Sequence, residues 1–356
     1  MSNALSKKSV FTKESLKKQF RWSEYLAKKI ITMAAFLSIA IIFLIFVFVF
    51  KESLPLFSFT STTNKTEIQQ VTIEKPETYG VPLEDLTLGI EKKENQTVDN
   101  IDFNSTWNTF ISSEWVPVSK RPRFGLIPLF VGTLKVTIIA IFLAGPLSIL
   151  AAIYTSCFAS KRRKEIIKPI IEMLAAFPSV VIGFFAMMIL ATFFQDVFGY
   201  DSRLNAFIGG IAMALAAIPI IYTIAEDALS SVPKTYKEAS LALGASQWQT
   251  AFFVILPAAI PGIFAALLLG IGRVFGETMI ALMATGNAAL VSANPFESVR
   301  TFAATIGSEM AETVFGETHY SVLFFIGSVL FLFSFALNAI AEFYIKGKLI
   351  KKIQGK

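Results

Sequence analysis

Residues that build metal sites, disulfide frameworks and hydrophilic surfaces are scarce in this sequence. Among 356 residues there is one Cys (Cys157) and one His (His319), and only 16% of the residues are charged. A single Cys excludes a disulfide framework within the chain, and a single His argues against a His-based metal site. The nucleotide-binding pattern G-x-x-x-x-G-K-[S/T] is missing, as is any Ser–His–Asp constellation. We therefore expect no cofactor, no metal site and no ATPase or other enzyme activity of the chain's own.

Long uncharged apolar runs are what the sequence has instead. Hydrophobic residues make up 54% of the chain and 35 residues are Phe, whereas a soluble protein carries about a quarter of charged residues. Residues 31–50 lack any charge and are long enough to cross about 30 Å of hydrocarbon as a helix. A cleaved signal peptide fits this run poorly, because a long basic segment precedes it and no small-x-small cleavage site follows Phe50.

Five further apolar runs complete a predicted set of six transmembrane helices. They lie near residues 130–157, 170–194, 205–225, 258–284 and 320–343. The fold class predicted from these runs is an all-α integral membrane protein.

Lys and Arg residues gather in three segments that a six-span topology places on one side of the membrane. These segments are the N-terminal tail, residues 161–164, and the C-terminal tail. Because an excess of Lys and Arg marks the cytoplasmic side, we expect both termini in the cytoplasm. The net charge of +6 is then explained by topology and by contact with lipid head groups, and we predict no nucleic-acid partner.

The topology divides the chain into five parts. They are a cytoplasmic basic tail (1–30), a first transmembrane helix (31–50), an external (periplasmic) loop region (51–125), a core with five transmembrane helices and the cytoplasmic connection 226–256 (126–345), and a second cytoplasmic basic tail (346–356). A loop as long as the external one is either functional or disordered. Trp107 and Trp115 within it are expected at the membrane interface, where Trp is enriched.

The cytoplasmic connection 226–256 carries more helix-boundary signals than a simple turn requires. Thr235–Glu238 and Ser246–Gln249 each have the residues of a capping box. Gly244 between them is placed to end the first short helix in a left-handed conformation. We expect two short helices joined by a rigid corner, which we call the bend. The alternative is a plain turn between spans. Small side chains on the first helix would let another protein approach closely: Ala239, Ser240 and Ala242.

Arg273 and Glu277 stand in the fifth predicted span, where a charge costs about 2.5–3.5 kcal/mol on insertion scales. A spacing of four places them on one helical face, where they can pair. Gly270, Gly272 and Gly276 thin the helix surface around them and permit close helix approach. Arg suits an oxyanion ligand. The pair is therefore either a contact for an oxyanion or a buried ion pair that only fixes helix packing.

Three other polar residues near the spans receive structural interpretations. Lys135 is expected to extend its ammonium group to the interface. Glu172 is expected at the start of the third span, where the positive end of a helix favours a carboxylate. His319 is expected to be an interfacial residue at the outer mouth of the last span.

The bend resembles a known signature. Glu238-Ala239-Ser240, Gly244 and the later stretch Val254–Pro257 are similar to the EAA signature of ABC-importer permeases. Ser240 stands where Ala is usual, and Val254 where Ile is usual. The resemblance implies the type I ABC importer (MetI-like) permease fold with six transmembrane helices. It also implies that the loop is a coupling helix, docked on a separate ATPase through Glu238, Ala239, Ser240 and Gly244.

Further stretches resemble the phosphate (Pst) branch of these permeases, and the PstC type more than the PstA type. They are SSEWVPV at 112–118, LAAFPSVVIGFFA at 174–186 and GRVFGETMIALMATGN at 272–287. This resemblance implies a phosphate importer of the bacterial cytoplasmic membrane. Its other parts would be a PstA-like permease, a PstB-like ATPase dimer and a PstS-like external phosphate-binding protein. It also implicates Arg273 and Glu277 in the passage of phosphate.

Two alternatives stay open on the sequence. One is a permease of the same architecture for another oxyanion, such as sulfate or molybdate. The other is a sensory or regulatory membrane protein that uses residues 51–125 as a receptor. An ATPase with a P-loop and an oxyanion-binding protein encoded beside this gene would favour transport.

Overall fold

The computed structural model describes residues 22–56, 109–119 and 122–344. The predictions for the tails and for most of the 51–125 loop, including Trp107, lie outside these residues. The chain forms two compact units, residues 1–51 and residues 52–356.

Six helices among the described residues are long and apolar enough to cross a membrane, which confirms the predicted number. The candidate spans are Tyr25–Leu56, Ile127–Phe158, Ser179–Phe198, Ala206–Ser230, Gln247–Phe275 and Thr318–Ile340. The first of them contains the predicted run 31–50 and includes most of helix α1 (Trp22–Ser53).

Within the unit formed by residues 52–356, the regular structure of the described residues is helical apart from one small hairpin. Its helices are α3 (Ile127–Ile153), α4 (Lys161–Ala176), α5 (Ser179–Phe185), α6 (Ala191–Phe198), α7 (Ala206–Ser230), α8 (Lys234–Ala242), α9 (Gln247–Thr250), α10 (Leu256–Phe275), α11 (Met279–Ala284), α12 (Phe302–Glu309) and α13 (Thr318–Tyr344). The hairpin pairs strands β1 (Trp115–Val116) and β2 (Arg123–Phe124) antiparallel, with Trp115 opposite Phe124.

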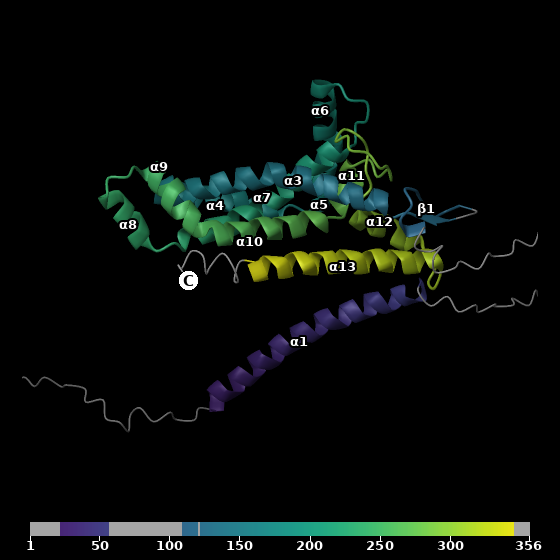
Figure 1. Ribbon diagram of the computed structural model, residues 1–356, viewed down its shortest axis with the longest axis horizontal. Helices are drawn as coiled ribbons and strands as arrows, with labels where there is room; N and C mark the ends of the chain where they lie inside the picture. Colours follow the sequence, from purple (N-terminus) through teal and green to yellow (C-terminus); the bar gives the residue numbers. More distant parts are fainter. Residues whose placement is uncertain (1–21, 57–108, 120–121, 345–356) are drawn as a thin grey trace, which may run out of the picture. The chain divides into compact units, whose positions relative to one another are not determined.

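Helix α7 lies at the centre of this unit, packed against α3 and α10, and α10 in turn packs against α13 (Figure 1). Small residues allow these helices to approach closely. A Cβ added at Gly210 of α7 would collide with Ile139 of α3, and one added at Gly270 of α10 would collide with Ile221 of α7. This is the small-residue packing typical of helices in a bilayer. Because lipid tails are as apolar as the helix surfaces, helices associate there through close packing and not through a hydrophobic driving force.

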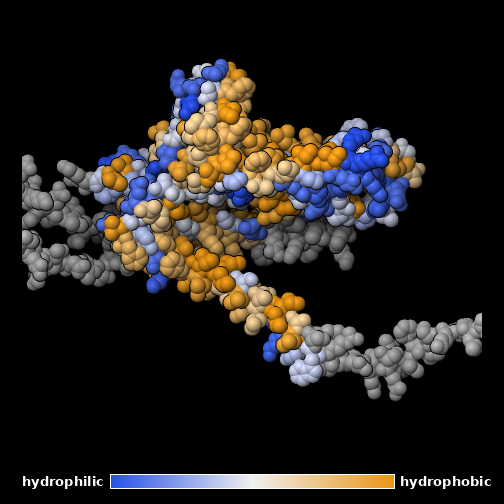
Figure 2. All heavy atoms as spheres, turned by 180° about the vertical axis from the view of Figure 1, so that it is seen from behind, coloured by the Kyte–Doolittle hydropathy of each residue, from blue (hydrophilic) through white to orange (hydrophobic). Residues whose placement is uncertain are grey.

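The two ends of the helical unit differ in what they carry. At one end lie α8, α9 and the start of α4, which we call the bend end (Figure 1). At the other lie β1, β2, α12 and the start of α13, which we call the hairpin end. Figure 2 shows hydrophilic residues gathered at the bend end and hydrophobic residues along the helices between the ends. Helix α6 projects from the bundle (Figures 1 and 2).

The third predicted span, 170–194, is wrong at its start. Helix α4 ends at Ala176 and the candidate span begins at Ser179, so the chain breaks at Phe177–Pro178. Phe177 has an extended ψ of 126°, as expected before a proline, whose ring disfavours the helical conformation in the preceding residue. Glu172 therefore lies inside α4, not at the start of a span as predicted.

The fifth predicted span, 258–284, is displaced along the chain. The candidate span is Gln247–Phe275, and α10 ends at Gly276, which has a φ of −93° and a ψ of 3°. Glycine is a poor helix former, and the separate short helix α11 begins three residues later. The pattern of apolar residues continues across this break, which is why the break was not predicted.

Three of the long helices contain a five-residue π-helical turn. These turns are Tyr154–Phe158, Ala186–Leu190 and Ala251–Ile255. The last one joins α9 of the bend to α10. A π-turn accommodates one extra residue in a helix and is frequent at functional sites.

Candidate functional site

The corner between α8 and α9 has the predicted rigid geometry. Gly244 has a φ of +85°, in the left-handed region that glycine adopts without strain. Ser246 and Gln249 form the predicted capping box: the Ser246 amide donates to Gln249 Oε1 at 2.8 Å, and the Gln249 amide donates to Ser246 Oγ at 3.3 Å. The predicted second helix therefore starts where the sequence placed it.

The first predicted capping box, Thr235–Glu238, does not form. Helix α8 starts at Lys234 with Pro233 at its N-cap, and no side chain caps it. Pro233 has a φ of −55° and a ψ of 134°. Its ring fixes φ and needs no amide hydrogen bond, so the helix begins one residue before Thr235. Thr235 lies inside the first turn and has no free cap position to fill.

The proposed docking residues of the bend lie on the surface. Glu238 and Ala239 are exposed, and Ser240 is partly buried because its hydroxyl lies 3.0 Å from Thr250 Oγ1. Helix α8 has no buried residue. Large apolar side chains stand out around it: Tyr236 is 52%, Leu243 is 89% and Trp248 is 54% exposed. Exposed apolar side chains grouped on a rigid corner are typical of a protein-binding surface.

Arg273 and Glu277 form the expected pair, but at a helix end and not in the middle of a span. Arg273 lies in the last turn of α10, and Glu277 follows the Gly276 cap. Arg273 Nη2 lies 3.5 Å from Glu277 Oε2, the Glu277 side chain is 8% exposed and the Arg273 side chain is 50% exposed. The carboxylate is thus held inside the chain, while the Arg273 side chain as a whole is half exposed.

The glycines around this pair act differently from one another. Gly270 permits close packing on α7, as predicted, whereas a Cβ at Gly272 would meet nothing within 4 Å. Gly272 therefore faces open space beside Arg273, and none of the residues that the structure describes covers the surface there. An uncovered arginine next to open space fits a role in contact with an anion or with another subunit.

A buried carboxylate that the sequence analysis did not select lies near the end of α7. Glu226 is 1% exposed and accepts from Lys164 Nζ at 2.5 Å and from Lys168 Nζ at 3.0 Å. Both lysines belong to α4. The hydrogen bond to Glu226 raises the pKa of Lys168 above its usual value, although partial burial opposes this. The signal in the sequence was the single acidic pair Glu226-Asp227 at the end of an apolar run.

A second buried carboxylate lies at the hairpin end. Glu309 of α12 is 8% exposed and accepts from Trp115 Nε1 at 3.0 Å and from Arg300 Nη1 at 2.6 Å, and its Oε2 lies 2.9 Å from His319 Nε2. Burial disfavours the charged carboxylate, but the hydrogen bonds from His319 and Trp115 and the charge of Arg300 outweigh it and lower the pKa of Glu309. Four separate segments of the chain therefore meet at one side chain.

This cluster changes the interpretation of two residues. Trp115 is 6% exposed and packs within the chain, which gives it a structural role, and its position at the membrane interface stays a prediction. His319 is hydrogen-bonded to Glu309 and is not merely an interfacial residue. Lys135 donates to the Asn294 carbonyl oxygen at 3.0 Å, which agrees with its predicted structural role.

Comparison with known proteins gives one family and several relatives. Residues 144–348 match the family described as binding-protein-dependent transport system inner membrane component. The chain is 34% identical to the probable ABC transporter permease protein YqgH of Bacillus subtilis, over 63% of this chain and 72% of that protein. It is 30% identical to the phosphate transport system permease protein PstC of Mesorhizobium japonicum, over 67% of this chain and 78% of that protein.

Other similarities are of the same kind. The chain is 31% identical to the phosphate transport system permease protein PstC 1 of Mycobacterium tuberculosis, over 67% of this chain and 77% of that protein. Among solved structures, an inward-facing conformation of the MetNI methionine ABC transporter aligns with a TM-score of 0.46 at 20% identity, covering 61% of this chain and 93% of that one.

Proposed function

Since the chain belongs to the family of binding-protein-dependent transport system inner membrane components, we propose that it is the permease subunit of an ATP-driven importer of inorganic phosphate. Family membership makes it a multi-pass protein of the inner membrane. It also implies an ATPase and a binding protein as partners. The choice of phosphate rests on one observation, the similarity to PstC proteins at about 30% identity over two thirds of the chain.

The specific partners belong to the proposal. They are a PstA-like second permease, a PstB-like ATPase dimer, a PstS-like external phosphate-binding protein and the surrounding lipid. Both termini and the bend end would face the cytoplasm, and the hairpin end would face outward. The basic residues 161–164 near the bend end support this orientation, because Lys and Arg accumulate on the cytoplasmic side.

The bend would carry the contact with the ATPase. Glu238, Ala239, Ser240 and Gly244 form a corner that is fixed by a left-handed glycine and a capping box. Exposed Tyr236, Leu243 and Trp248 stand beside it and supply apolar surface for docking. A rigid corner transmits a push without bending, so closure of the ATPase dimer on ATP would displace the ends of α7 and α10.

Arg273 would supply the positive charge that phosphate meets inside the membrane, and Glu277 would hold its orientation. Their geometry supports this division, because Glu277 is buried and the Arg273 side chain is half exposed. The neighbouring carboxylate also weakens the site for anions when it is empty. A transport path needs binding that is favourable enough for entry and weak enough for release.

Reconstitution of the complete complex tests the substrate. The chain is purified with its second permease and ATPase, placed in proteoliposomes and supplied with the binding protein, and uptake of radiolabelled phosphate is measured with and without ATP. We expect ATP-dependent phosphate uptake that excess unlabelled phosphate suppresses. Suppression by sulfate or molybdate instead would assign another oxyanion. Absence of uptake of any oxyanion, with intact assembly, would favour the sensory or regulatory alternative.

The role of Arg273 is tested by Arg273→Gln in the same vesicles. We expect phosphate uptake to be lost while the complex still assembles and hydrolyses ATP. Arg203→Gln is the matched control, because Arg203 is an exposed arginine away from the pair. Normal uptake by Arg273→Gln would leave the pair with a packing role only.

The role of the bend is tested by Glu238→Arg and Gly244→Pro. We expect the ATPase to co-purify poorly with both variants, since one reverses a surface charge and the other cannot adopt a positive φ. Glu312→Arg, an exposed charge reversal at the hairpin end, serves as the control. Co-purification of the ATPase at the normal yield with the bend variants would count against docking at this corner.

A further inference from the structure

Glu226 is tied to three donors at the point where α7 approaches the bend. Its oxygens accept from Lys164 at 2.5 Å, from Lys168 at 3.0 Å and from the Ser230 hydroxyl at 2.7 Å. Lys168 also lies 3.6 Å from Asp227. Because Glu226 is only 1% exposed, separation from the lysines would leave a buried charge unpaired, which is strongly unfavourable. Helices α4 and α7 are therefore linked at this point by charge.

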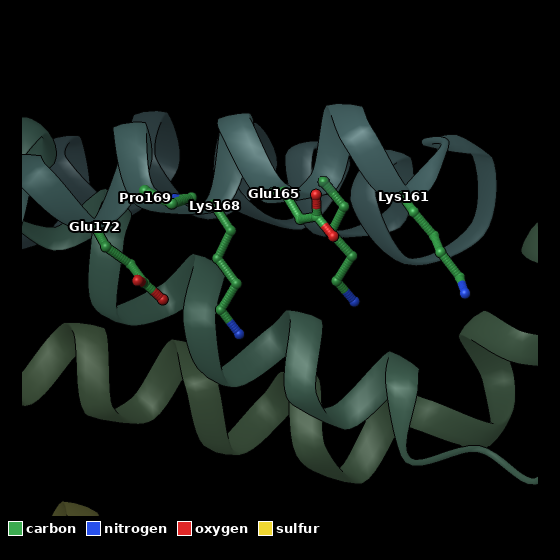
Figure 3. A pocket seen from close by; sticks show the side chains of 6 residues that line it. Lys161, Glu165, Lys168, Pro169 and Glu172 are labelled. Atoms are coloured by element: carbon green, nitrogen blue, oxygen red, sulfur yellow. The ribbon is translucent and has the colours of Figure 1, made fainter.

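Among the residues that the structure describes, few other contacts hold helix α4 against the rest of the unit. None of its residues is buried, Ile171 is the partly buried residue that packs against the apolar core, and Arg163 donates to the Tyr154 hydroxyl at 2.8 Å near its start. Figure 3 shows Lys161, Glu165, Lys168 and Glu172 along one side of α4. They line an open groove of about 490 Å³. The triad of Glu226, Lys164 and Lys168 is thus the strongest fastening of α4 on α7.

The triad lies between two parts of the chain with different tasks. Only Ser231, Val232 and Pro233 separate α7 from α8, so Glu226 is close to the segment that would dock on the ATPase. On the other side, α4 continues across Phe177–Pro178 into α5 and the third candidate span. A movement of α8 that carries the end of α7 with it reaches α4 through the triad.

Building on the proposed function, we infer that Glu226 is a positioning residue for coupling. Through Lys164 and Lys168 it passes the displacement of the bend to α4, and from there to the third span. The lysine side chains remain 38% and 30% exposed, so the link lies at the edge of the open groove. Helix α4 can then follow α7 without any opening of the apolar core.

A cysteine on α4 reports this movement without any need for phosphate. Met173 is 64% exposed on α4, and Met173→Cys in a Cys157→Ser background gives one labelling site in the chain. The complete complex, with its partner subunits freed of reactive cysteines, is reconstituted in proteoliposomes. The rate of maleimide labelling at position 173 is measured with and without ATP and vanadate. Phosphate uptake and ATP hydrolysis are measured on the same vesicles.

The inference predicts that Glu226→Gln separates hydrolysis from transport. We expect uptake per ATP hydrolysed to fall about tenfold, within the usual range of coupling between sites. The ATP-driven change in labelling at position 173 is lost, while the ATPase still co-purifies. Glu165→Gln is the matched control, because Glu165 lines the same groove on α4 and forms no hydrogen bond with Glu226 among the described residues. It leaves the uptake ratio and the labelling change as in the parent.

A charge exchange separates positioning from simple stability. Lys164→Glu combined with Glu226→Lys, in a Lys168→Met background that removes the like charge next to position 226, re-forms one ion pair between α4 and α7 and should restore the labelling change and the uptake ratio to the level of Lys168→Met alone. Lys168→Met, which leaves the bond from Lys164 intact, should reduce both partially and carries the test if the Glu226 variants do not assemble. Unchanged uptake ratio and labelling in Glu226→Gln or, failing its assembly, in Lys168→Met overturns the inference. If the parent complex takes up no phosphate, the proposed function fails, while the labelling still tests Glu226.

Discussion

The bend end and the hairpin end each contain a buried glutamate that faces cationic side chains, yet the two carboxylates connect very different surroundings. The Glu226 carboxylate links α4 to α7, and the helix that it fastens has no buried residue. Glu309 joins the hairpin, the 287–301 loop, α12 and α13 through Trp115, Arg300 and His319. A buried carboxylate thus links two helices at the bend end and joins four segments at the hairpin end.

The surroundings of Glu309 are also better packed. Trp115 and Phe124 meet edge to face at 5.8 Å, and His319 packs against both rings. A second apolar cluster that includes Leu56, Phe110 and Leu129 surrounds them. No such cluster covers α4 among the residues that the structure describes. A carboxylate inside a packed junction fixes the segments around it, whereas a carboxylate under an otherwise bare helix can move with that helix.

Among the substitutions that test this difference between the two ends, Glu309→Ala should have the largest effect on stability. Removal of the carboxylate takes away the acceptor of Arg300 Nη1 and the partner of His319 Nε2 in a poorly exposed position, while Arg300 Nε keeps its bond to Asn287. Loss of one partner from a buried pair costs about 3–5 kcal/mol, so we expect a clear drop in the unfolding temperature of the purified chain. Glu312→Ala, three residues away and exposed, should stay within about 0.5 kcal/mol of the parent. Equal unfolding temperatures for the two variants would refute the fixed junction.

Acid should weaken the hairpin end through the same residue. The pKa of Glu309 is lowered in the folded chain, so its contribution to stability is complete above the ordinary carboxyl pKa of about 4.3 and is lost as the pH falls through the lower, folded value. We expect the difference in unfolding temperature between the parent and Glu309→Gln to shrink as the pH falls below about 4.3. A difference that does not change with pH would show that the charge of Glu309 contributes nothing.

Trp115→Phe sharpens the comparison by removing one bond and keeping the ring. The hydrogen bond from Nε1 to Glu309 disappears, while contacts with Phe124 and His319 are largely kept. A hydrogen bond to a charged group contributes about 1.5–3 kcal/mol, and Arg300 and His319 remain, so we expect a loss near the lower value in denaturant unfolding. Trp248→Phe, at an exposed position with no such bond in the described residues, is the control. A smaller loss for Trp115→Phe than for Trp248→Phe would contradict the junction.

Lys168→Met should have the smallest effect on stability. Lys164 still pairs with Glu226, and Lys168 is partly exposed, so we expect a loss of about 1 kcal/mol or less. The pKa of Lys168 is raised, so its contribution is complete below the ordinary lysine pKa of about 10.4 and disappears only above it. The difference from the parent should therefore stay constant between about pH 6 and pH 9. A difference that varies in this range would place another titrating group at the bend end.

Local patterns in the sequence predicted much of the fold and part of the site. The six spans follow from uncharged runs, the Ser246–Gln249 capping box from a spacing of three, and the Arg273–Glu277 pair from a spacing of four. Each depends on residues that are neighbours along the chain. Pro178 is a signal in the sequence for the break at Phe177–Pro178. It was not used, because apolar residues continue on both sides of it. The capping box predicted at Thr235 does not form, because Pro233 takes the N-cap position of α8.

The two buried carboxylates could not be predicted in the same way. Glu226 lies 62 residues from Lys164, and Glu309 lies 194 residues from Trp115. Their partners are set by the packing of helices that are distant in sequence, and no spacing rule connects them. The sequence does mark Glu226 as an acidic residue at the edge of an apolar run, which is a reason to search for a cation, but it does not say which one.

The π-helical turn Ala251–Ile255 has a consequence for the direction in which the bend faces. It joins α9 to α10 without interruption and holds one residue more than an α-helical turn would need. Each residue of a regular helix turns the chain by about 100°. Deleting one residue from this segment would therefore restore an ordinary helix and swing Trp248 and the corner at Gly244 about a quarter of a circle around the axis of α10. The orientation of the corner around the axis of α10 therefore depends on the number of residues in this segment.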